Sequence, residues 1–421
     1  MSFETISVVG LGYIGLPTAA MFASRKKKVI GVDVNQRAVD TINRGEIHIV
    51  EPDLDMIVHA AVTEGYLKAV TTPEPADAFL IAVPTPFKEC AEGEIPEPDL
   101  RFIEAASKAI APVLKKGDLV ILESTSPVGA TEQMAEWLAE ARPELTFPQN
   151  AGQSADVNVA HCPERVLPGH VVHELVENDR VIGGMSTRCS ERSVELYKAF
   201  VLGDCVITNA RTAEMAKLTE NSCRDVQIAF ANELSIICDK LDINVWELIS
   251  LANRHPRINI LQPGPGVGGH CIAVDPWFIV SKTPEEAQII HTARKVNDAK
   301  PEWVINKVKL AIAEFLQTNP DKTAREVTVA CYGLAFKPDI DDLRESPAMA
   351  IAKKIAEMHA GRVIAVEPNI DSATEKLGNI ELVEFELASE EADVQVLLVD
   401  HKVFKETLIT NGVVIDTKGI W

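Results

Sequence analysis

Short runs of β-branched and apolar residues alternate with amphipathic segments from the start of the chain. Strands are predicted at 6–9, 29–32, 79–83 and 119–122, and a helix at 16–24 follows the first of them. The alternation continues through two further predicted strands at 181–183 and 206–208. This order is typical of a parallel sheet flanked by helices.

The pattern becomes helical in the middle of the chain and then returns to alternation. Helical segments at 212–252 and 285–317 flank a stretch rich in glycine and proline. After residue 317 we expect a helix at 347–359 and strands at 327–332, 363–366, 394–399 and 413–415. We therefore predict an α/β protein with two Rossmann-like, doubly wound domains joined by a central helical region. The expected divisions are 1–210, 211–318 and 319–421, with the middle part connecting the halves or forming a homodimer.

Composition narrows the class of protein. A chain of 421 residues exceeds the size of a single core, and its formal charge of −21 disfavours nucleic acid as a partner. No apolar run approaches the roughly 18 residues of a membrane span, and the first residues lack a basic segment before an apolar one. We expect a cytoplasmic protein without a membrane partner. The eight cysteines form no CxxC pair, so no metal site is expected.

A glycine motif after the first strand predicts a dinucleotide site. Gly10, Gly12 and Gly15 have the GxGxxG spacing, and the second strand ends near Asp33. The glycines allow the backbone to approach a pyrophosphate, and a carboxylate at that strand end accepts hydrogen bonds from a ribose. The negative charge favours NAD over NADP. Thr85 and Thr125 follow later strands and are either ligand contacts or ordinary turn residues.

Cys271 follows a segment with four glycines in six positions, 264–269. It is either a small core residue or a nucleophile beside a closely approached ligand. A dehydrogenase that carries a primary alcohol to the acid needs such a thiolate, because the aldehyde must form a thiohemiacetal before a second hydride can leave. Lys217 and Asn221, one helical turn apart, are candidates for handling protons and the oxyanion, unless they belong to a solvated helix face.

Taken in order, these motifs resemble the UDP-glucose/GDP-mannose dehydrogenase family over essentially the whole chain. The matching segments are Gly10–Pro17, Glu123–Gly129, Pro163–Arg165, Glu214 with Lys217 and Asn221, Gly268–Cys271 with Asp275, and Phe336–Pro347. The resemblance implies an NAD-dependent, four-electron oxidation of a nucleotide-linked sugar, with Cys271 as the nucleophile. It implies that Lys217 and Asn221 manage protons and the oxyanion, and that Glu164 and Asp275 handle water in thioester hydrolysis.

The resemblance also implies two sets of binding residues. The NAD contacts that it implies beyond the glycines are Tyr13, Ile14, Asp33, Thr85, Thr131 and Arg344, to which we add Thr125 from its place after a strand. The expected UDP-sugar contacts, besides Lys217 and Asn221, are Arg165, Val166, Arg224, His255, Arg257, Gly268, Phe336, Lys337 and Lys418. Arginine and lysine suit a diphosphate, and in an acidic chain they must gather locally to bind one.

Three departures bear on which sugar is bound. Arg165 stands where members acting on UDP-glucose commonly carry an aromatic residue, Ile340 replaces a usual threonine, and the segment 253–257 resembles the acetamido-sugar branch. We therefore expect oxidation of the C6 alcohol of UDP-N-acetyl-D-mannosamine to the uronate, for a bacterial surface polysaccharide such as enterobacterial common antigen. The alternatives are UDP-glucose or another UDP-hexosamine, a two-electron β-hydroxyacid dehydrogenase, and a non-catalytic nucleotide-sugar sensor.

Overall fold

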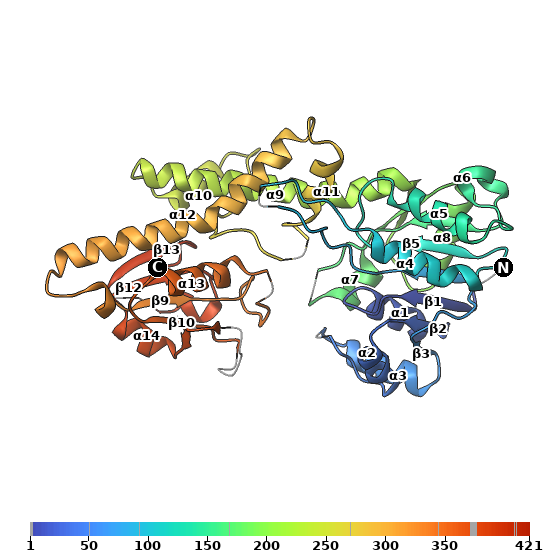
Figure 1. The fold of residues 1–421 in the computed structure, drawn as a ribbon, viewed down its shortest axis with the longest axis horizontal. Coiled ribbons are helices and arrows are strands. Elements are labelled where there is room, and N and C mark those ends of the chain that lie inside the picture. Colours follow the sequence, from blue (N-terminus) through green and yellow to red (C-terminus); the bar gives the residue numbers. More distant parts are fainter. Residues whose placement is uncertain are drawn as a thin grey trace. The chain divides into compact units, whose positions relative to one another are not determined.

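A computed structural model describes residues 3–49, 51–91, 93–167, 169–269, 271–343, 345–370, 377–407, 409 and 411–421. The chain divides into two compact units. The first comprises residues 1–220 with 277–283, and the second comprises 221–276 with 284–421. Each unit contains one sheet (Figure 1).

The first unit is built on an eight-stranded sheet with the order β3-β2-β1-β4-β5-β6-β7-β8. Neighbouring strands are parallel except β6 and β7, which pair antiparallel. Chain order runs outward from β1 in one direction and from β4 in the other, so β1 and β4 form the switch point where such sheets bind ligands. The strands are β1 (Thr5–Val9), β2 (Lys28–Val32), β3 (Leu67–Val70), β4 (Ala78–Ile81), β5 (Leu119–Leu122), β6 (Asn158–His161), β7 (Arg180–Gly184) and β8 (Cys205–Asn209).

Helices cover both faces of this sheet. Leu119 and Ile121 of β5 pack into one core and Val120 and Leu122 into another, which is the period of two expected for a strand buried on both sides. The first core includes residues of α1 (Gly15–Ser24), α2 (Gln36–Asn43), α3 (Leu54–Thr63), α7 (Val171–Glu177) and α8 (Thr187–Tyr197). The second includes residues of α4 (Arg101–Ile110), η1 (Ala111–Val113) and α5 (Ala130–Ala141); α6 (Pro148–Ala151) and η2 (Gly152–Ser154) follow α5.

Long helices occupy the middle of the chain. Helix α9 (Ala210–Lys240) continues from the first unit into the second and is followed by α10 (Val245–Ala252). Helix α11 (Asp275–Lys282) begins shortly after the glycine-rich segment, and α12 (Gln288–Thr318) contains Pro301. In α9 and α12 of the second unit, polar pairs such as Asn232 with Asn297 are buried and hydrogen-bonded to each other.

The second unit carries a five-stranded, wholly parallel sheet with the order β11-β10-β9-β12-β13. One face packs on α12 and α13, and the other on α14 and α15. The strands are β9 (Val329–Tyr332), β10 (Val363–Val366), β11 (Glu381–Leu382), β12 (Val394–Leu397) and β13 (Val413–Asp416). The remaining elements are η3 (Ala324–Glu326), α13 (Pro347–Met358), α14 (Phe385–Glu391) and α15 (Lys402–Lys405).

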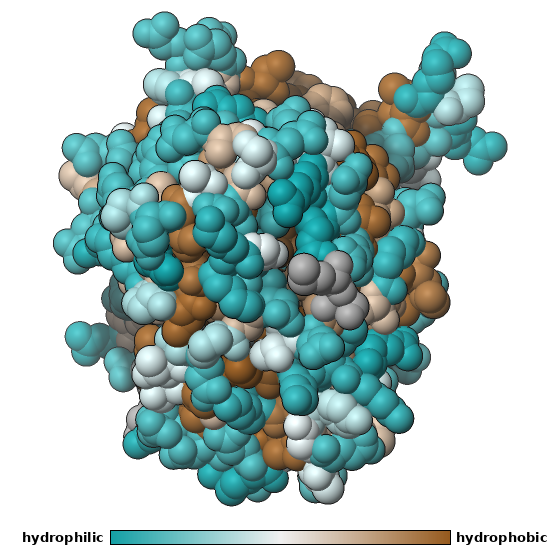
Figure 2. Space-filling model, turned by 90° about the vertical axis from the view of Figure 1, so that its right-hand side faces the viewer, coloured by the Kyte–Doolittle hydropathy of each residue, from teal (hydrophilic) through white to brown (hydrophobic). Residues whose placement is uncertain are grey.

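The predicted fold class is confirmed: two Rossmann-like α/β parts carry the ends of the chain, with long helices in the middle. The sequence pattern did not indicate β3, β6 or β11, nor the antiparallel pairing of β7. None of the helices that the structure describes has the length and apolar character needed to cross a bilayer. The face shown in Figure 2 is mostly hydrophilic, with apolar residues scattered over it.

Candidate active site

The glycine motif forms the turn from β1 into α1, at the switch point of the first sheet. Gly10 has a φ of +91°, and its N–H donates to the carbonyl of Val32 at 2.8 Å. A Cβ on Gly15 would lie 1.7 Å from the carbonyl oxygen of Gly10, so the helix can start this close only with glycine there. A Cβ on Gly12 would meet nothing within 4 Å, so this side of the turn is open to a ligand.

Asp33 lies directly after β2 and is half-buried beside this turn. One carboxylate oxygen accepts the N–H of Leu11 and the other the N–H of Asn35, each at 2.8 Å. Each oxygen retains a lone pair for a further donor. The exposed Gly12 and Tyr13, the N-terminus of α1 and this anchored carboxylate fit a dinucleotide pyrophosphate and its ribose.

Three threonines are predicted to contact NAD. Thr85 and Thr125 follow neighbouring strands of the sheet, and Thr131 lies in the helix after the second of these strands. Thr85, after β4, donates its hydroxyl to the carbonyl of Thr125, after β5, at 2.7 Å. Thr131 is fully buried and donates to the carboxylate of Glu214 at 2.6 Å. Glu214 also accepts the N–H groups of Gly129 and Thr131 and so caps α5. Direct contacts of these threonines with NAD stay a prediction.

Glu164, after β6, belongs to a buried polar cluster in the first unit. Its carboxylate accepts Arg180 Nη1 at 2.6 Å and the N–H of Arg165 at 2.7 Å. The guanidinium of Arg180 lies 5.0 Å from the centre of the Tyr197 ring, and Tyr197 donates its hydroxyl to Glu123 at 2.6 Å. Burial raises the pKa of Glu123 to about 7, with Arg180 opposing the rise and Glu164 adding to it.

The side chains that follow Glu164 are less buried. Arg165 forms an ion pair with Glu220 at 2.7 Å, and Val166 is half-buried. Their roles as sugar contacts stay a prediction.

Helix α9 carries both Lys217 and Asn221, one turn apart. Lys217 is 9 % exposed, which argues against a solvated helix face. Asn221 donates its side-chain N–H to the carboxylate of Asp275 at 2.5 Å, and Asp275 is itself buried at the start of α11. The structure thus brings two of the predicted catalytic residues into direct contact.

The glycine segment before Cys271 packs closely against residues that follow β9 in the second unit. A Cβ on Gly268 would lie 2.5 Å from the carbonyl oxygen of Glu345, and one on Gly269 would touch the ring of Phe336 at 3.4 Å. Cys271 follows on the exposed side, one turn before α11. The glycines therefore let the segment pack against Phe336 while Cys271 stays accessible.

Lys337 lies near Cys271, and Lys418 lies near the start of the glycine segment. Burial lowers the pKa of Lys337, repulsion from Arg224 lowers it further, and Cys271 acts in the opposite direction. Lys418 Nζ lies 3.7 Å from where a Cβ of Gly264 would stand, and it pairs with Asp400 at 3.2 Å. Lys418 thus lies beside the start of the glycine segment, and Lys337 lies near both Arg224 and Cys271, all within the second unit.

A buried chain of amides, which sequence reasoning missed, holds the start of the glycine segment. The Gly264 N–H donates to Asn232 at 2.9 Å, and Asn232 donates to Asn297 at 2.9 Å. Asn297 donates to the carboxylate of Asp225 at 2.8 Å, which also accepts Arg294 at 2.6 Å. Residues so far apart in sequence give no local signal of this arrangement.

His255 and Arg257 are exposed in the loop after α10. Asn253 closes that loop by accepting the N–H of Ile260 at 2.7 Å and donating to its carbonyl at 2.9 Å. Within the described residues, no contact joins either side chain to the glycine segment. Arg344, the remaining expected NAD contact, lies outside the described residues.

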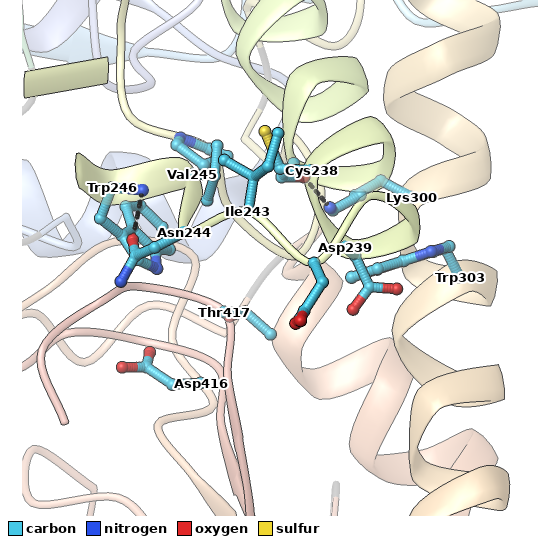
Figure 3. A pocket seen from close by; sticks show the side chains of 13 residues that line it. Cys238, Asp239, Ile243, Asn244, Val245, Trp246, Lys300, Trp303, Asp416 and Thr417 are labelled. Carbon is cyan, nitrogen blue, oxygen red and sulfur yellow. Dashed lines mark hydrogen bonds between the residues drawn. The ribbon is translucent and has the colours of Figure 1, made fainter. Parts of the chain in front are cut away.

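A separate cavity of about 490 Å³ opens between the end of α9, the start of α10, the middle of α12 and the end of β13 (Figure 3). Lys300 is buried beside it, donates to Ser235 and lies 3.9 Å from the centre of the Trp303 ring. Burial lowers the pKa of Lys300 to about 8. Apart from Thr417, which precedes Lys418, and Pro263, which precedes Gly264, its lining is unrelated to the sequence motifs.

Comparisons with known proteins identify the family to which the chain belongs. Residues 4–201 match the NAD binding domain of the UDP-glucose/GDP-mannose dehydrogenase family, 211–299 its central domain and 330–421 its UDP binding domain. The chain is 68% identical to a UDP-N-acetyl-D-mannosamine dehydrogenase from Yersinia pestis, with full coverage of both. It is 62% identical to an NDP-N-acetyl-D-galactosaminuronic acid dehydrogenase from Ralstonia nicotianae, covering all of this chain and 97% of that one.

Solved structures give the same result. A UDP-D-ManNAc dehydrogenase from Pyrococcus horikoshii superposes with a TM-score of 0.84 at 36% identity, covering 99% of this chain and 96% of the other. A UDP-N-acetyl-mannosamine dehydrogenase from Staphylococcus aureus gives 0.81 at 40% identity, covering 99% and 95%. The chain belongs to the UDP-glucose/GDP-mannose dehydrogenase family and uses NAD.

Proposed function

We propose that this enzyme oxidises the C6 alcohol of UDP-N-acetyl-D-mannosamine to the carboxylate, with two NAD and one water consumed per sugar. The observation that carries the reaction type is Cys271, exposed after a glycine segment and one turn before α11, with Lys337 close enough to interact with it electrostatically. The sugar is supported by full-length relatives of that activity at 65–68% identity. The product would supply a bacterial surface polysaccharide.

The chemistry assigns a role to each group. The first oxidation converts the alcohol to an aldehyde, and Lys217 takes the hydroxyl proton. The Cys271 thiolate then adds to the aldehyde carbon, forming a C–S bond, while the amide of Asn221 and the ammonium of Lys217 stabilise the oxyanion. NAD supplies hydride-acceptor chemistry in both oxidations, the second of which converts the thiohemiacetal to a thioester.

Hydrolysis of the thioester completes the reaction. Water adds to the carbonyl carbon and gives a proton to Glu164, the C–S bond breaks, and the thiolate of Cys271 leaves. Asp275, held by Asn221 at 2.5 Å, assists with the proton. Lys337 and Lys418 suit the diphosphate of the UDP group, and Phe336 suits an adjoining apolar surface.

The test counts NADH per limiting sugar. With excess NAD, UDP-N-acetyl-D-mannosamine, UDP-N-acetyl-D-galactosamine and UDP-glucose are supplied in parallel. Two NADH from the first alone is expected. Two from another sugar alone would replace the substrate and keep the mechanism, whereas one NADH per sugar would contradict the role of Cys271. A Cys271→Ser control should produce no net acid.

We also propose that a second copy of the chain covers one face of α9. Phe230 and Ile237 of α9, and Leu241 directly after its end, are spaced to share that face and are 54 %, 44 % and 61 % exposed. A homodimer would bury them. Light scattering should give a dimer mass for the wild type and a monomer mass for Phe230→Glu/Ile237→Glu. Met56→Glu, at an exposed apolar residue of α3, should leave the dimer mass unchanged.

A further inference from the structure

The buried ion pair between Arg180 and Glu164 has a geometry that a catalytic carboxylate needs. Arg180 and Glu164 are 3 % and 7 % exposed, and Arg180 Nη1 donates to one carboxylate oxygen of Glu164 at 2.6 Å. The other oxygen accepts the backbone N–H of Arg165 at 2.7 Å. A carboxylate held at both oxygens cannot rotate, and each oxygen keeps one lone pair for a further partner.

Arg180 is itself fixed by aromatic side chains. It begins β7, and its guanidinium lies 5.0 Å from the ring centre of Tyr197 and 6.0 Å from that of Phe200. Both rings are buried, at 0 % and 2 % exposure. The strand and the rings therefore leave the guanidinium little freedom, so its position determines where Glu164 points.

The charges in the cluster also favour the ion pair between Arg180 and Glu164. Besides Glu164, Glu123 is the carboxylate beside Arg180 in the cluster, and burial raises its pKa to about 7. Tyr197 donates to one oxygen of Glu123, while the other oxygen and Arg180 Nη2 make no hydrogen bond to any described residue. The single guanidinium thus makes its charge-assisted hydrogen bond with Glu164.

We propose that Arg180 is a positioning residue for thioester hydrolysis: it aims the Glu164 carboxylate at the water that cleaves the acyl–Cys271 bond. This inference rests on the proposed function, in which Glu164 receives the proton of that water. Arg180 has no part in the two oxidations, because those steps do not need Glu164. Without Arg180, the enzyme should complete both oxidations and then stall as the thioester.

The experiment mixes Arg180→Lys and Arg180→Gln enzymes rapidly with excess NAD and UDP-N-acetyl-D-mannosamine. We expect a burst of about two NADH per active site at close to the wild-type rate, followed by turnover slowed by roughly 10–100-fold, the range of a lost charge-assisted hydrogen bond. The intact mass of acid-quenched protein should show the sugar acyl group on Cys271. Arg180→Lys should retain more turnover than Arg180→Gln.

A matched control is Arg142→Lys in the same unit, because Arg142 bonds the carbonyls of Ala111 and Leu114 and makes no contact with Glu164. It should lower the melting temperature without changing the ratio of burst to steady-state rate. Wild-type turnover in folded Arg180 variants, or an equal loss of burst and turnover, would overturn the proposal. If Arg180→Gln does not fold, the Lys variant gives the same decision. Absence of NADH from the wild type would instead reject the proposed substrate.

Discussion

The two Rossmann-like sheets start with the same backbone turn and then differ in how they can meet a phosphate. Gly10 donates its N–H to the carbonyl of Val32 at 2.8 Å, and Gly333 donates to Val366 at 2.9 Å, both glycines having positive φ. In each turn the next residue donates its N–H to an acidic side chain at the end of the second strand.

Further along the turn the two halves diverge. The first has Gly12 and Gly15, and α1 begins at Gly15; the second has Ala335 and Pro338 at the equivalent places, and its next helix begins at Pro347. The first turn therefore presents backbone N–H groups and a helix N-terminus to a ligand. The second presents the side chain of Lys337 instead. One fold thus offers a phosphate either a backbone site or a side-chain cation.

The acidic residues differ in the same sense. Asp33 is half-buried and binds two backbone N–H groups. Glu367 is 6 % exposed, accepts the N–H groups of Leu334 and Ala335, and lies 3.1 Å from His401 Nε2. We infer that Asp33 has capacity left for a ribose, whereas Glu367 holds its own turn together.

The largest expected effect comes from breaking the backbone site. In Gly15→Ala the new Cβ would meet the carbonyl oxygen of Gly10 at 1.7 Å, which forces α1 away from the turn. NAD affinity should fall by more than about 100-fold, and stability by roughly 2–4 kcal/mol. Calorimetric titration with NAD and chemical denaturation measure both. Near-normal NAD binding would mean that the close approach of helix and turn is not what builds the site.

The second prediction removes the side-chain cation. Lys337→Met should raise the KM for the UDP-sugar by roughly 10–100-fold, because one charge-assisted hydrogen bond is lost, while NAD affinity is retained. Lys337→Arg should keep part of the affinity. Initial-rate kinetics with each substrate varied in turn measure this. A parallel loss of NAD affinity would contradict the assignment of the cation to the second half alone.

Much of this contrast could be predicted from the sequence, because its parts are local. The spacing of Gly10, Gly12 and Gly15 and the position of Asp33 follow from strand and turn geometry, and Lys337 lies in a contiguous motif. Arg180 with Glu164, and Asn232 with Gly264, could not be predicted, because their contacts depend on how separate elements pack. A charged residue at the start of a strand looks like a surface residue until its buried partner is known.

The third prediction changes the carboxylate that is expected to bind the ribose. Asp33→Asn keeps the size but loses the charge, and its amide nitrogen cannot accept one of the two N–H groups, of Leu11 and Asn35, that the carboxylate binds. NAD affinity should therefore fall by roughly tenfold, and discrimination against NADP should narrow. Glu367→Gln is the matched change in the second half and should leave NAD affinity within about twofold. Titration with NAD and NADP distinguishes the two variants. An equal loss of NAD affinity in both would contradict the proposal that Asp33, and not Glu367, binds the ribose.

The smallest expected effect concerns how Glu367 stabilises its turn. Burial opposes ionisation, but hydrogen bonds from His401 and from the N–H groups of Leu334 and Ala335 outweigh it and lower the pKa of Glu367. Since His401 Nδ1 accepts the N–H of Asp339 at 2.9 Å, Nε2 is the nitrogen that donates to Glu367.

A lowered pKa contributes stability that is fully present above the unfolded-state value of about 4.3 and is lost as pH falls through the folded-state value. Urea denaturation between pH 6 and 3 should therefore show the wild type losing its advantage over Glu367→Gln, by about 1 kcal/mol, only at the acid end. Parallel curves for the two proteins would show that the ionised carboxylate adds nothing to the turn.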